Sequence, residues 1–422
     1  MNVNTFGRTL SRIIDVFLAL FLVLNCQSVY QNSVGFNFRV YEITALLIVL
    51  SFVVKFSFYK TSFYNFNRFS LFVCCYFVYL IIFILFSVQK GAIVSFLGRY
   101  GLFPFVAFNF ILELPQEDKF YIFKKFIDWV TIITLISLLF WSFGSTFKLI
   151  SPTSLFTFKW GEVLPVNSYF GVYFETQYVD WIGIEWFYRN TAIFVEGPMF
   201  CLVLIIAIIF IVVSPIQIKN TKIKIVVLCL GLISTFSTTG LLFLGLLILC
   251  FFYKNRNLRK YLLIALPFII IMGVFFLIKK SSTGSFFLRL DDYVAGFKTW
   301  ITKPVFGFGF GNFDAVIENM SRDDNIGFSN SIFAVLVQGG LIYGLMFFIP
   351  IIYGITIGIK RKSSSLLFLS LSYVFLFVLI VFQTAFINFF IWMLIYSFPV
   401  KKRKLKRVDL VPYLPQKGGG SL

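Results

Sequence analysis

The chain has 422 residues, of which 59% are hydrophobic, and its net charge is +19. A composition this apolar excludes a soluble domain of ordinary size, and basic residues scattered between apolar stretches argue against a nucleic-acid partner. Histidine is absent and all six cysteines lie within apolar runs, so we expect no metal, no cofactor and no disulfide framework.

Apolar stretches long enough to cross a bilayer recur about twelve times along the chain. Roughly 20 apolar residues in a helix span the ~30 Å hydrocarbon core. The predicted spans are 13–30, 41–58, 70–87, 92–112, 126–143, 197–214, 223–237, 239–253, 261–278, 337–358, 364–381 and 385–399. The sequence therefore predicts an all-α, polytopic integral membrane protein, with residues 1–407 forming a single transmembrane domain.

Lysine and arginine concentrate in every second connection between these spans. The basic connections lie at 55–68, 119–125, 219–224, 254–260 and 360–362, and both ends of the chain are also basic. The positive-inside rule places this side in the cytoplasm, together with the N-terminus, the C-terminus and a cytoplasmic tail at 408–417. Residues 418–422, Gly-Gly-Gly-Ser-Leu, are typical of an added flexible linker.

Two long loops, at about 144–196 and 279–336, fall on the opposite side of the predicted membrane. Loops beyond ~15 residues are usually functional or disordered, and the aromatic content of these two argues against disorder. The first loop is rich in aromatic residues, among them Trp181, Trp186 and Tyr188. They suit either an interfacial aromatic belt or a surface on which sugar rings stack, and composition does not separate the two.

The first loop ends directly before an uninterrupted apolar helix. Pro198 suits the first turn of that helix, which places Glu196 at or just before its N-terminus. Glu196 is therefore either a helix cap or a candidate general base. Arg189, seven residues earlier, is either an interfacial anchor or a candidate ligand for an anionic group.

The second loop contains Arg289, Asp291 and Asp292, followed by alternating glycines between 303 and 313. These glycines do not follow a strand of a βαβ unit, so they do not indicate a dinucleotide site. We expect them to let the backbone turn tightly against the membrane helices. Asp291 and Asp292 form either a solvated pair or a further source of a catalytic base.

Arg99 lies about eight residues into the fourth span, roughly 12 Å from its outer end. A cation at such depth costs ~2.5–3.5 kcal/mol on insertion scales, so we expect it to face the protein interior or a polar cavity. The alternative is that its long side chain reaches back to the outer surface. Asp15, one helical turn from Arg12, is expected to form a local ion pair with it.

The order of these segments resembles the O-antigen polymerase (Wzy) and O-antigen ligase superfamily of bacterial membrane glycosyltransferases. Residues 189–199 are similar to an Arg-x-x-x-x-Phe-x-Glu-Pro sequence, with Gly197 inserted before Pro198. The other similar segments are Ser237-Thr238-Thr239-Gly240, Arg289 followed by 303–309, and Ser329-Asn330-Ser331 leading into 338–344. The resemblance extends over about residues 90–358.

This resemblance implies a GT-C-like helical fold in the bacterial inner membrane, with both long loops in the periplasm. It also implies an undecaprenyl diphosphate-linked oligosaccharide as substrate. A lipid diphosphate is a good leaving group that needs mainly cations, which Arg189, Arg289 and Arg99 would supply. The acceptor hydroxyl needs a base, for which we favour Glu196 over Asp291. The remaining candidates for substrate binding are Asp292, Trp181, Trp186, Tyr188 and Asn330.

The ligase branch of this superfamily carries a functional histidine where this chain has Ser329. Because the chain has no histidine, the resemblance favours a repeat-unit polymerase, which moves a growing glycan from one undecaprenyl diphosphate to another lipid-linked repeat unit. Its implied partners are membrane lipids, a chain-length regulator and a flippase. The alternatives are an O-antigen ligase acting on lipid A-core, another lipid-linked glycan transferase, and a transporter or flippase, although the positions of the long loops break the paired halves typical of transporters.

Overall fold

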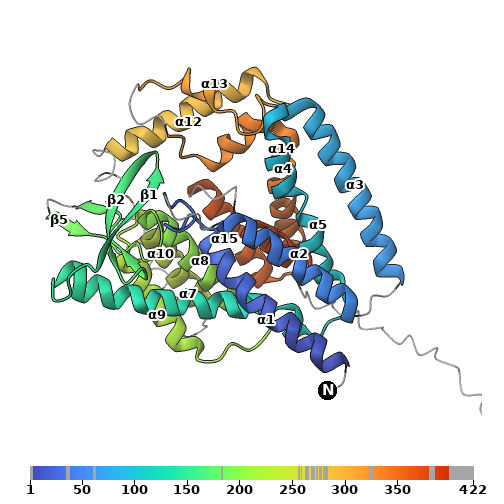
Figure 1. Cartoon of the computed structure of the whole chain (residues 1–422), viewed down its shortest axis with the longest axis horizontal. Helices are drawn as coiled ribbons and strands as arrows, with labels where there is room; N and C mark the ends of the chain where they lie inside the picture. The colour runs from blue at the N-terminus through green and yellow to red at the C-terminus, as the bar shows by residue number, and fades with distance from the viewer. Residues whose placement is uncertain are drawn as a thin grey trace, which may run out of the picture.

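The computed structural model describes residues 3–34, 39–59, 63–181, 184–254, 284–322, 327–379 and 385–398, and short pieces between 257 and 278. These residues are mostly helical, with little strand (Figure 1). The helices that match predicted spans are α1 (Val3–Leu24), α2 (Val40–Phe58), α3 (Phe63–Ser87), α4 (Ile93–Tyr100), α5 (Phe103–Ile111), α7 (Tyr121–Phe140), α8 (Gly197–Val213), α9 (Thr221–Ser234), α10 (Thr238–Lys254), α14 (Ser331–Lys360), α15 (Ser364–Leu379) and α16 (Ile387–Tyr396). The predicted span 261–278 lies mostly outside the described residues, as do 408–417 and 418–422.

Several of the helices have the length and composition of membrane spans. Among the described residues, five stretches are long and apolar enough to cross a bilayer: Val40–Phe58, Asn65–Ser87, Lys90–Ile111, Tyr121–Thr146 and Ser331–Lys360. The last residues of the fourth stretch, Trp141–Thr146, form a π-helical turn, η2. Together with shorter apolar helices, these stretches suggest insertion into a membrane. The total of twelve crossings stays a prediction.

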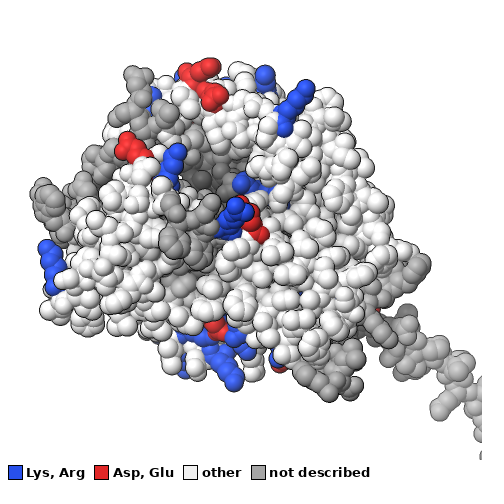
Figure 2. All heavy atoms as spheres, in the orientation of Figure 1, with Lys and Arg blue, Asp and Glu red and all other residues white. Residues whose placement is uncertain are grey.

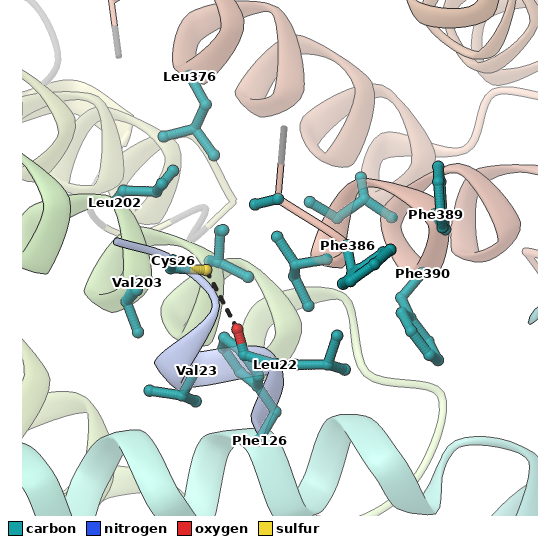
Figure 3. Close-up of a cluster of buried hydrophobic side chains, with 14 of the residues drawn as sticks. Leu22, Val23, Cys26, Phe126, Leu202, Val203, Leu376, Phe386, Phe389 and Phe390 are labelled. Carbon is teal, nitrogen blue, oxygen red and sulfur yellow. Dashed lines mark hydrogen bonds between the residues drawn. The ribbon is translucent and has the colours of Figure 1, made fainter. Parts of the chain in front are cut away.

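Helix α8 lies at the centre of the hydrophobic core. It is apolar on all sides and nearly all of its side chains are buried, as expected for a helix surrounded by other helices. In Figure 3, Leu202 and Val203 of α8 lie around Cys26, with Phe126 of α7 close by. The Cys26 thiol donates a hydrogen bond to the Leu22 carbonyl at 3.3 Å, so this cysteine serves as a buried apolar residue with a satisfied donor.

The first long loop folds into two small β-sheets, which the all-α prediction did not include. Strands β1 (Ser154–Trp160), β2 (Glu162–Tyr169) and β3 (Tyr173–Phe174) form an antiparallel sheet in that order, and β4 (Tyr178–Trp181) pairs with β5 (Ile184–Tyr188). Aromatic side chains favour a pleated, half-buried surface, and Phe158 is fully packed into the main core. The aromatic residues of the loop therefore belong largely to strands.

The second long loop contains α12 (Gly284–Thr302) and α13 (Asp314–Ile317), which lie together at the top of Figure 1. Beneath them is a small separate core of Ala295, Val316 and Val337, covered by aromatic side chains such as Phe328 and Phe333. Val337 belongs to the first part of α14. The second loop is thus packed onto the start of that helix.

Helix α14 is interrupted where the glycine-rich segment of the second loop meets it. Gly340 has φ +60 and ψ −155, and a Cβ there would lie 2.3 Å from the Val305 backbone. Four backbone hydrogen bonds join the segments: Phe308 N–H to Val337 O (2.7 Å), Gly309 N–H to Gln338 O (3.0 Å), Leu341 N–H to Pro304 O (2.8 Å) and Ile342 N–H to Val305 O (3.2 Å). The predicted tight turn of these glycines against a long apolar helix is confirmed, and the bonds satisfy backbone groups that the broken helix leaves free.

Ion pairs join several elements of the predicted cytoplasmic side. Asp118 binds Arg8 and Arg12, whereas Asp15 binds Lys55 at 2.8 Å with both side chains buried. The predicted Arg12–Asp15 pair is therefore wrong, because each residue finds its partner on another helix or connection. In Figure 2, basic and acidic atoms gather at the lower edge of the molecule, and others lie beside a hollow near the middle of the face in view.

Candidate functional site

The segment from Arg189 to Glu196 is a buried, fixed piece of backbone. The Asn190 side chain donates hydrogen bonds to the hydroxyls of Ser137 (3.1 Å) and Ser234 (3.0 Å), which belong to α7 and α9. Its carbonyl oxygen accepts the backbone N–H of Ala192, which has a left-handed φ of 49. These contacts explain why a polar asparagine is completely buried here.

Gln177 joins the two ends of this segment. Its backbone carbonyl accepts the Arg189 N–H at 3.2 Å, and its side-chain oxygen accepts the Gly197 N–H at 3.1 Å. One residue therefore fixes the backbone of Arg189 and the first residue of α8. Sequence reasoning did not single out Gln177, because no local pattern marks a residue whose partners lie 12 and 20 positions away.

Gly197 gives the Arg189 side chain room to cross the start of α8. A Cβ on Gly197 would lie 2.6 Å from Cδ of Arg189 and 3.2 Å from the Thr235 carbonyl oxygen. A proline there would also lose the N–H that binds Gln177. Gly197 before Pro198 is thus explained by the arginine side chain that packs across it.

Glu196 directly precedes α8, as predicted, with an extended backbone (φ −148, ψ 155). Its carboxylate makes no capping hydrogen bond to the helix. Instead it accepts a hydrogen bond from Nε1 of Trp160, at the end of β1. The helix-cap interpretation therefore does not describe this side chain, and one indole holds the half-buried carboxylate in place.

Arg189 is a largely buried cation whose charge is not balanced by an ion pair within the described residues. Its Nε atom is buried and has no hydrogen-bond partner, and its guanidinium forms no ion pair within the described residues. Burial lowers the pKa of Arg189, and the nearby Glu196 carboxylate partly opposes this. A desolvated guanidinium with an unsatisfied N–H is costly unless it meets an anion, and its planar fork suits phosphate oxygens.

Arg99 is a second cation that forms no ion pair within the described residues, and it faces other protein segments as the sequence predicted. Its guanidinium lies 5.6 Å from the ring centre of Tyr41 and 5.7 Å from that of Phe310, a cation–π arrangement. The Nε of Arg99 and the hydroxyl of Tyr41 are both buried without hydrogen-bond partners. Phe310 reaches this position because its N–H donates to the Ser87 carbonyl at 2.7 Å.

Asp291 and Asp292 are held by Arg322, a residue that sequence reasoning missed. Arg322 donates to Asp291 at 2.9 Å and to Asp292 at 2.5 Å. Asp291 also accepts both the N–H (3.0 Å) and the hydroxyl (2.7 Å) of Ser321, and Asp292 accepts the N–H of Ser329 at 2.8 Å. Since Asp292 is only 1% exposed, the interpretation of a solvated pair is wrong.

The two neighbouring carboxyl groups differ in their electrostatics. Burial raises the pKa of Asp292 above its usual value, although Arg322 and the Ser329 N–H oppose this. Burial also acts to raise the pKa of Asp291, but the bonds from Ser321 and Arg322 outweigh it and hold that pKa below its usual value. Both carboxylates therefore have bonded partners within the second loop, whereas the hydrogen bond that the described residues give to the Glu196 carboxylate comes from the Trp160 indole.

The other predicted site residues have contacts of their own, except for two side chains that lie outside the described part of the structure. Arg289 is half-buried on α12, where burial raises the pKa of the Tyr293 hydroxyl and the Arg289 charge partly opposes this. Asn330 caps α14 by accepting the Phe333 N–H at 3.0 Å, and its buried Nδ2 has no partner. Tyr188 stacks on Tyr178 with ring centres 3.9 Å apart. The side chains of Trp181 and Trp186 lie outside the described part of the structure.

A buried carboxylate that sequence reasoning also missed supports the first loop. Glu175 is 7% exposed and accepts hydrogen bonds from Ser145 (2.7 Å), Asn167 (2.8 Å) and Tyr169 (2.8 Å). Burial and the bond to Glu175 raise the pKa of the Tyr169 hydroxyl. This network binds the sheet to the η2 turn. Glu175 lies two residues before Gln177, which binds Arg189 and Gly197.

The described residues contain no group of three or more histidine, cysteine, aspartate or glutamate side chains that could hold a metal ion. Comparisons with models of known families, with curated proteins and with solved structures found no match for this chain.

Proposed function

We propose that this chain is a polysaccharide repeat-unit polymerase of the O-antigen polymerase type. The observation that carries the proposal is that Arg189, whose buried Nε has no hydrogen-bond partner among the described residues, lies near the Glu196 carboxylate on a fixed segment before α8. A cation for a phosphate leaving group and a carboxylate base are the two groups that glycosyl transfer from a lipid diphosphate requires. The long apolar helices support a lipid-linked substrate.

The proposed reaction joins a growing glycan to a second lipid-linked repeat unit. A hydroxyl oxygen of the acceptor sugar bonds to the anomeric carbon of the donor glycan while the bond from that carbon to the diphosphate oxygen breaks. The hydroxyl proton passes to Glu196, and the electron pair leaves with undecaprenyl diphosphate. Arg189 would bind the diphosphate charge, with Arg99 and Arg289 as further phosphate ligands.

Glu196 is a better candidate for the base than Asp291. Asp291 accepts two bonds from Ser321 and one from Arg322, and these hold its pKa low. In the proposal Asp292, Asn330, Trp181, Trp186 and Tyr188 contribute to substrate binding. The same proposal includes a GT-C-like fold in the bacterial inner membrane, with cytoplasmic termini and periplasmic loops. Its partners would be a flippase and a chain-length regulator.

The test is extension of purified undecaprenyl diphosphate-linked repeat units by the purified protein. Glu196→Gln keeps the shape of the side chain but removes its basicity, so we expect chain elongation to fall by roughly 10²–10⁴-fold. Glu162→Gln is the matched control, because Glu162 is an exposed residue of the same loop at the start of β2. Its product ladder should equal that of the wild type.

Arg189→Lys tests the other half of the pair. Lysine keeps the charge but loses the planar fork, so elongation should fall while protein yield is unchanged. A wild-type ladder from both Glu196→Gln and Arg189→Lys would contradict the proposed roles. Glycan transfer that occurs only when lipid A-core is supplied would identify a ligase, and movement of lipid-linked units across a vesicle membrane without extension would identify a transporter.

A further inference from the structure

A cavity of about 450 Å³ lies between α3, α5, α14 and α16, away from the Arg189–Glu196 site. Its lining includes Tyr76 and Tyr79 of α3, Ala107 of α5, Pro350 of α14 and Trp392 of α16. Helix α3 forms its outer wall and leans away from the other helices (Figure 1). Most of α3 is exposed, so the surroundings of this cavity in a membrane are lipid.

The surface of this cavity is almost entirely carbon, and the polar groups of three of its lining residues bond into the protein. The Tyr76 hydroxyl donates to the Tyr100 carbonyl at 2.8 Å, and the Tyr79 hydroxyl donates to the Ile342 carbonyl at 2.8 Å. The indole N–H of Trp392 donates to the Tyr373 hydroxyl at 2.8 Å. An occupant therefore meets ring faces and aliphatic groups, which suit a hydrocarbon chain.

Exposed cations lie at one end of the helices that form this cavity. Lys360, Arg361 and Lys362 are exposed at the end of α14, ten residues or roughly 15 Å beyond Pro350. Arg68 is exposed near the start of α3, eight residues or roughly 12 Å before Tyr76. These lengths match the hydrocarbon thickness of one leaflet, about half of the ~30 Å core.

We propose that this cavity binds one acyl chain of an anionic glycerophospholipid, whose phosphate lies at the level of Lys360–Lys362 and Arg68. The chain fills the space between α3 and α14, and the basic residues select an anionic head group. The lipid supports α3, whose own contacts with the protein leave most of its side chains exposed. This inference does not depend on the proposed glycosyl transfer.

The experiment uses Trp392 as a reporter inside the cavity. In the full chain, the other tryptophans are replaced by phenylalanine, and the protein is reconstituted in bilayers that contain phospholipids brominated on the acyl chain. Bromine quenches indole fluorescence only at short range. We expect brominated phosphatidylglycerol to quench Trp392 at about fivefold lower mole fraction than brominated phosphatidylcholine, the preference that even one nearby lysine or arginine provides.

Three variants separate the cavity from the general bilayer. Ala107→Phe fills the cavity and should abolish the saturable quenching, whereas Leu85→Phe, at an α3 position that is 73% exposed, should leave it unchanged. Joint replacement of Lys360, Arg361 and Lys362 by glutamine should remove the preference for phosphatidylglycerol. This variant changes no core residue, so it decides the matter even if Ala107→Phe does not fold.

Three results would overturn the proposal. The first is quenching that rises with the bulk content of either lipid alike. The second is absence of quenching by any lipid together with disulfide cross-linking of two copies through cysteine at Leu345, which would place a second copy of the chain on the cavity. The third is displacement of brominated phosphatidylglycerol by undecaprenyl phosphate at a lower mole fraction than by unlabelled phosphatidylglycerol, which would make the carrier lipid the occupant.

Discussion

The contact between Gly197 and Arg189 makes the geometry of the site open to a direct test. In Gly197→Ala, the added Cβ would lie 2.6 Å from Cδ of Arg189, whereas carbon atoms in contact are usually about 3.5–4.0 Å apart. The Thr235 carbonyl, 3.2 Å from the same Cβ, limits movement of the helix in the other direction. The arginine side chain must therefore shift by about 1 Å, and its guanidinium moves with it.

The expected effect on activity is much larger than the effect on stability. A misplacement of about 1 Å can lower a catalysed rate by roughly 10²-fold. Overpacking costs about 1–3 kcal/mol in well-packed cores, and the cost here should be near the lower value, because the obstructing atom belongs to a flexible side chain. Gly197→Ala should thus extend lipid-linked repeat units roughly 10²-fold more slowly than the wild type, with a thermal midpoint only slightly lowered.

The control and the refuting result both follow from the same geometry. A Cβ on Gly91 meets no atom within 4 Å, so Gly91→Ala should have wild-type activity. If Arg189 transmits the effect, Gly197→Ala should add no further loss in an Arg189→Ala background, since the two changes share one interaction. Wild-type activity of Gly197→Ala, or an equal additional loss in the Arg189→Ala background, would refute this account of the site.

Two further predictions concern the second loop and the topology. Arg322→Met leaves Asp291 and Asp292 without their cation, so the second loop should lose about 3–5 kcal/mol of local stability. This loss should be seen as faster amide hydrogen exchange in α12. The control Lys298→Met, at an exposed position of the same helix, should leave exchange unchanged. In a cysteine-free background, cysteine at the exposed Val163 should react with a membrane-impermeant thiol reagent from the periplasmic side, and cysteine at Lys222 only after the membrane is permeabilised; the reverse pattern would invert the predicted orientation.

The sequence predicted best those features that depend on neighbouring residues. The start of α8 follows from Glu196 and Pro198 at the boundary of an apolar run, and the structure begins the helix at Gly197. The positive φ of Gly307, Gly309 and Gly311 also agrees with the expected tight turns, whereas the break at Gly340 lies inside a predicted span. In each case, the signal is a local requirement of the backbone or of burial that a short stretch of sequence expresses.

The features that the sequence did not predict depend on partners far along the chain. Asp15 binds Lys55 on the next helix, and Asp292 binds Arg322 thirty residues later. Charge patterns along a helix indicate only partners three or four positions away, so such pairs cannot be read from spacing. The strands of the first loop also depend on partners elsewhere in the loop. Its aromatic residues suit an interfacial belt or a sugar-binding surface as well as a strand, and only the pairing of β1 with β2 separates these alternatives.

The interruption of α14 connects these local and distant features at Arg99. Gly339 and Gly340 open the helix, the segment 304–309 satisfies the exposed backbone groups, and the same segment continues into Phe310, whose ring lies against the Arg99 guanidinium. A buried cation in a membrane helix needs a polar or aromatic partner, and here the partner comes from the second loop. The position of Arg99 is therefore coupled to the docking of the second loop on α14. A change that loosens this docking should alter the environment of Arg99, a proposed phosphate ligand, although Arg99 is about 200 residues away in sequence.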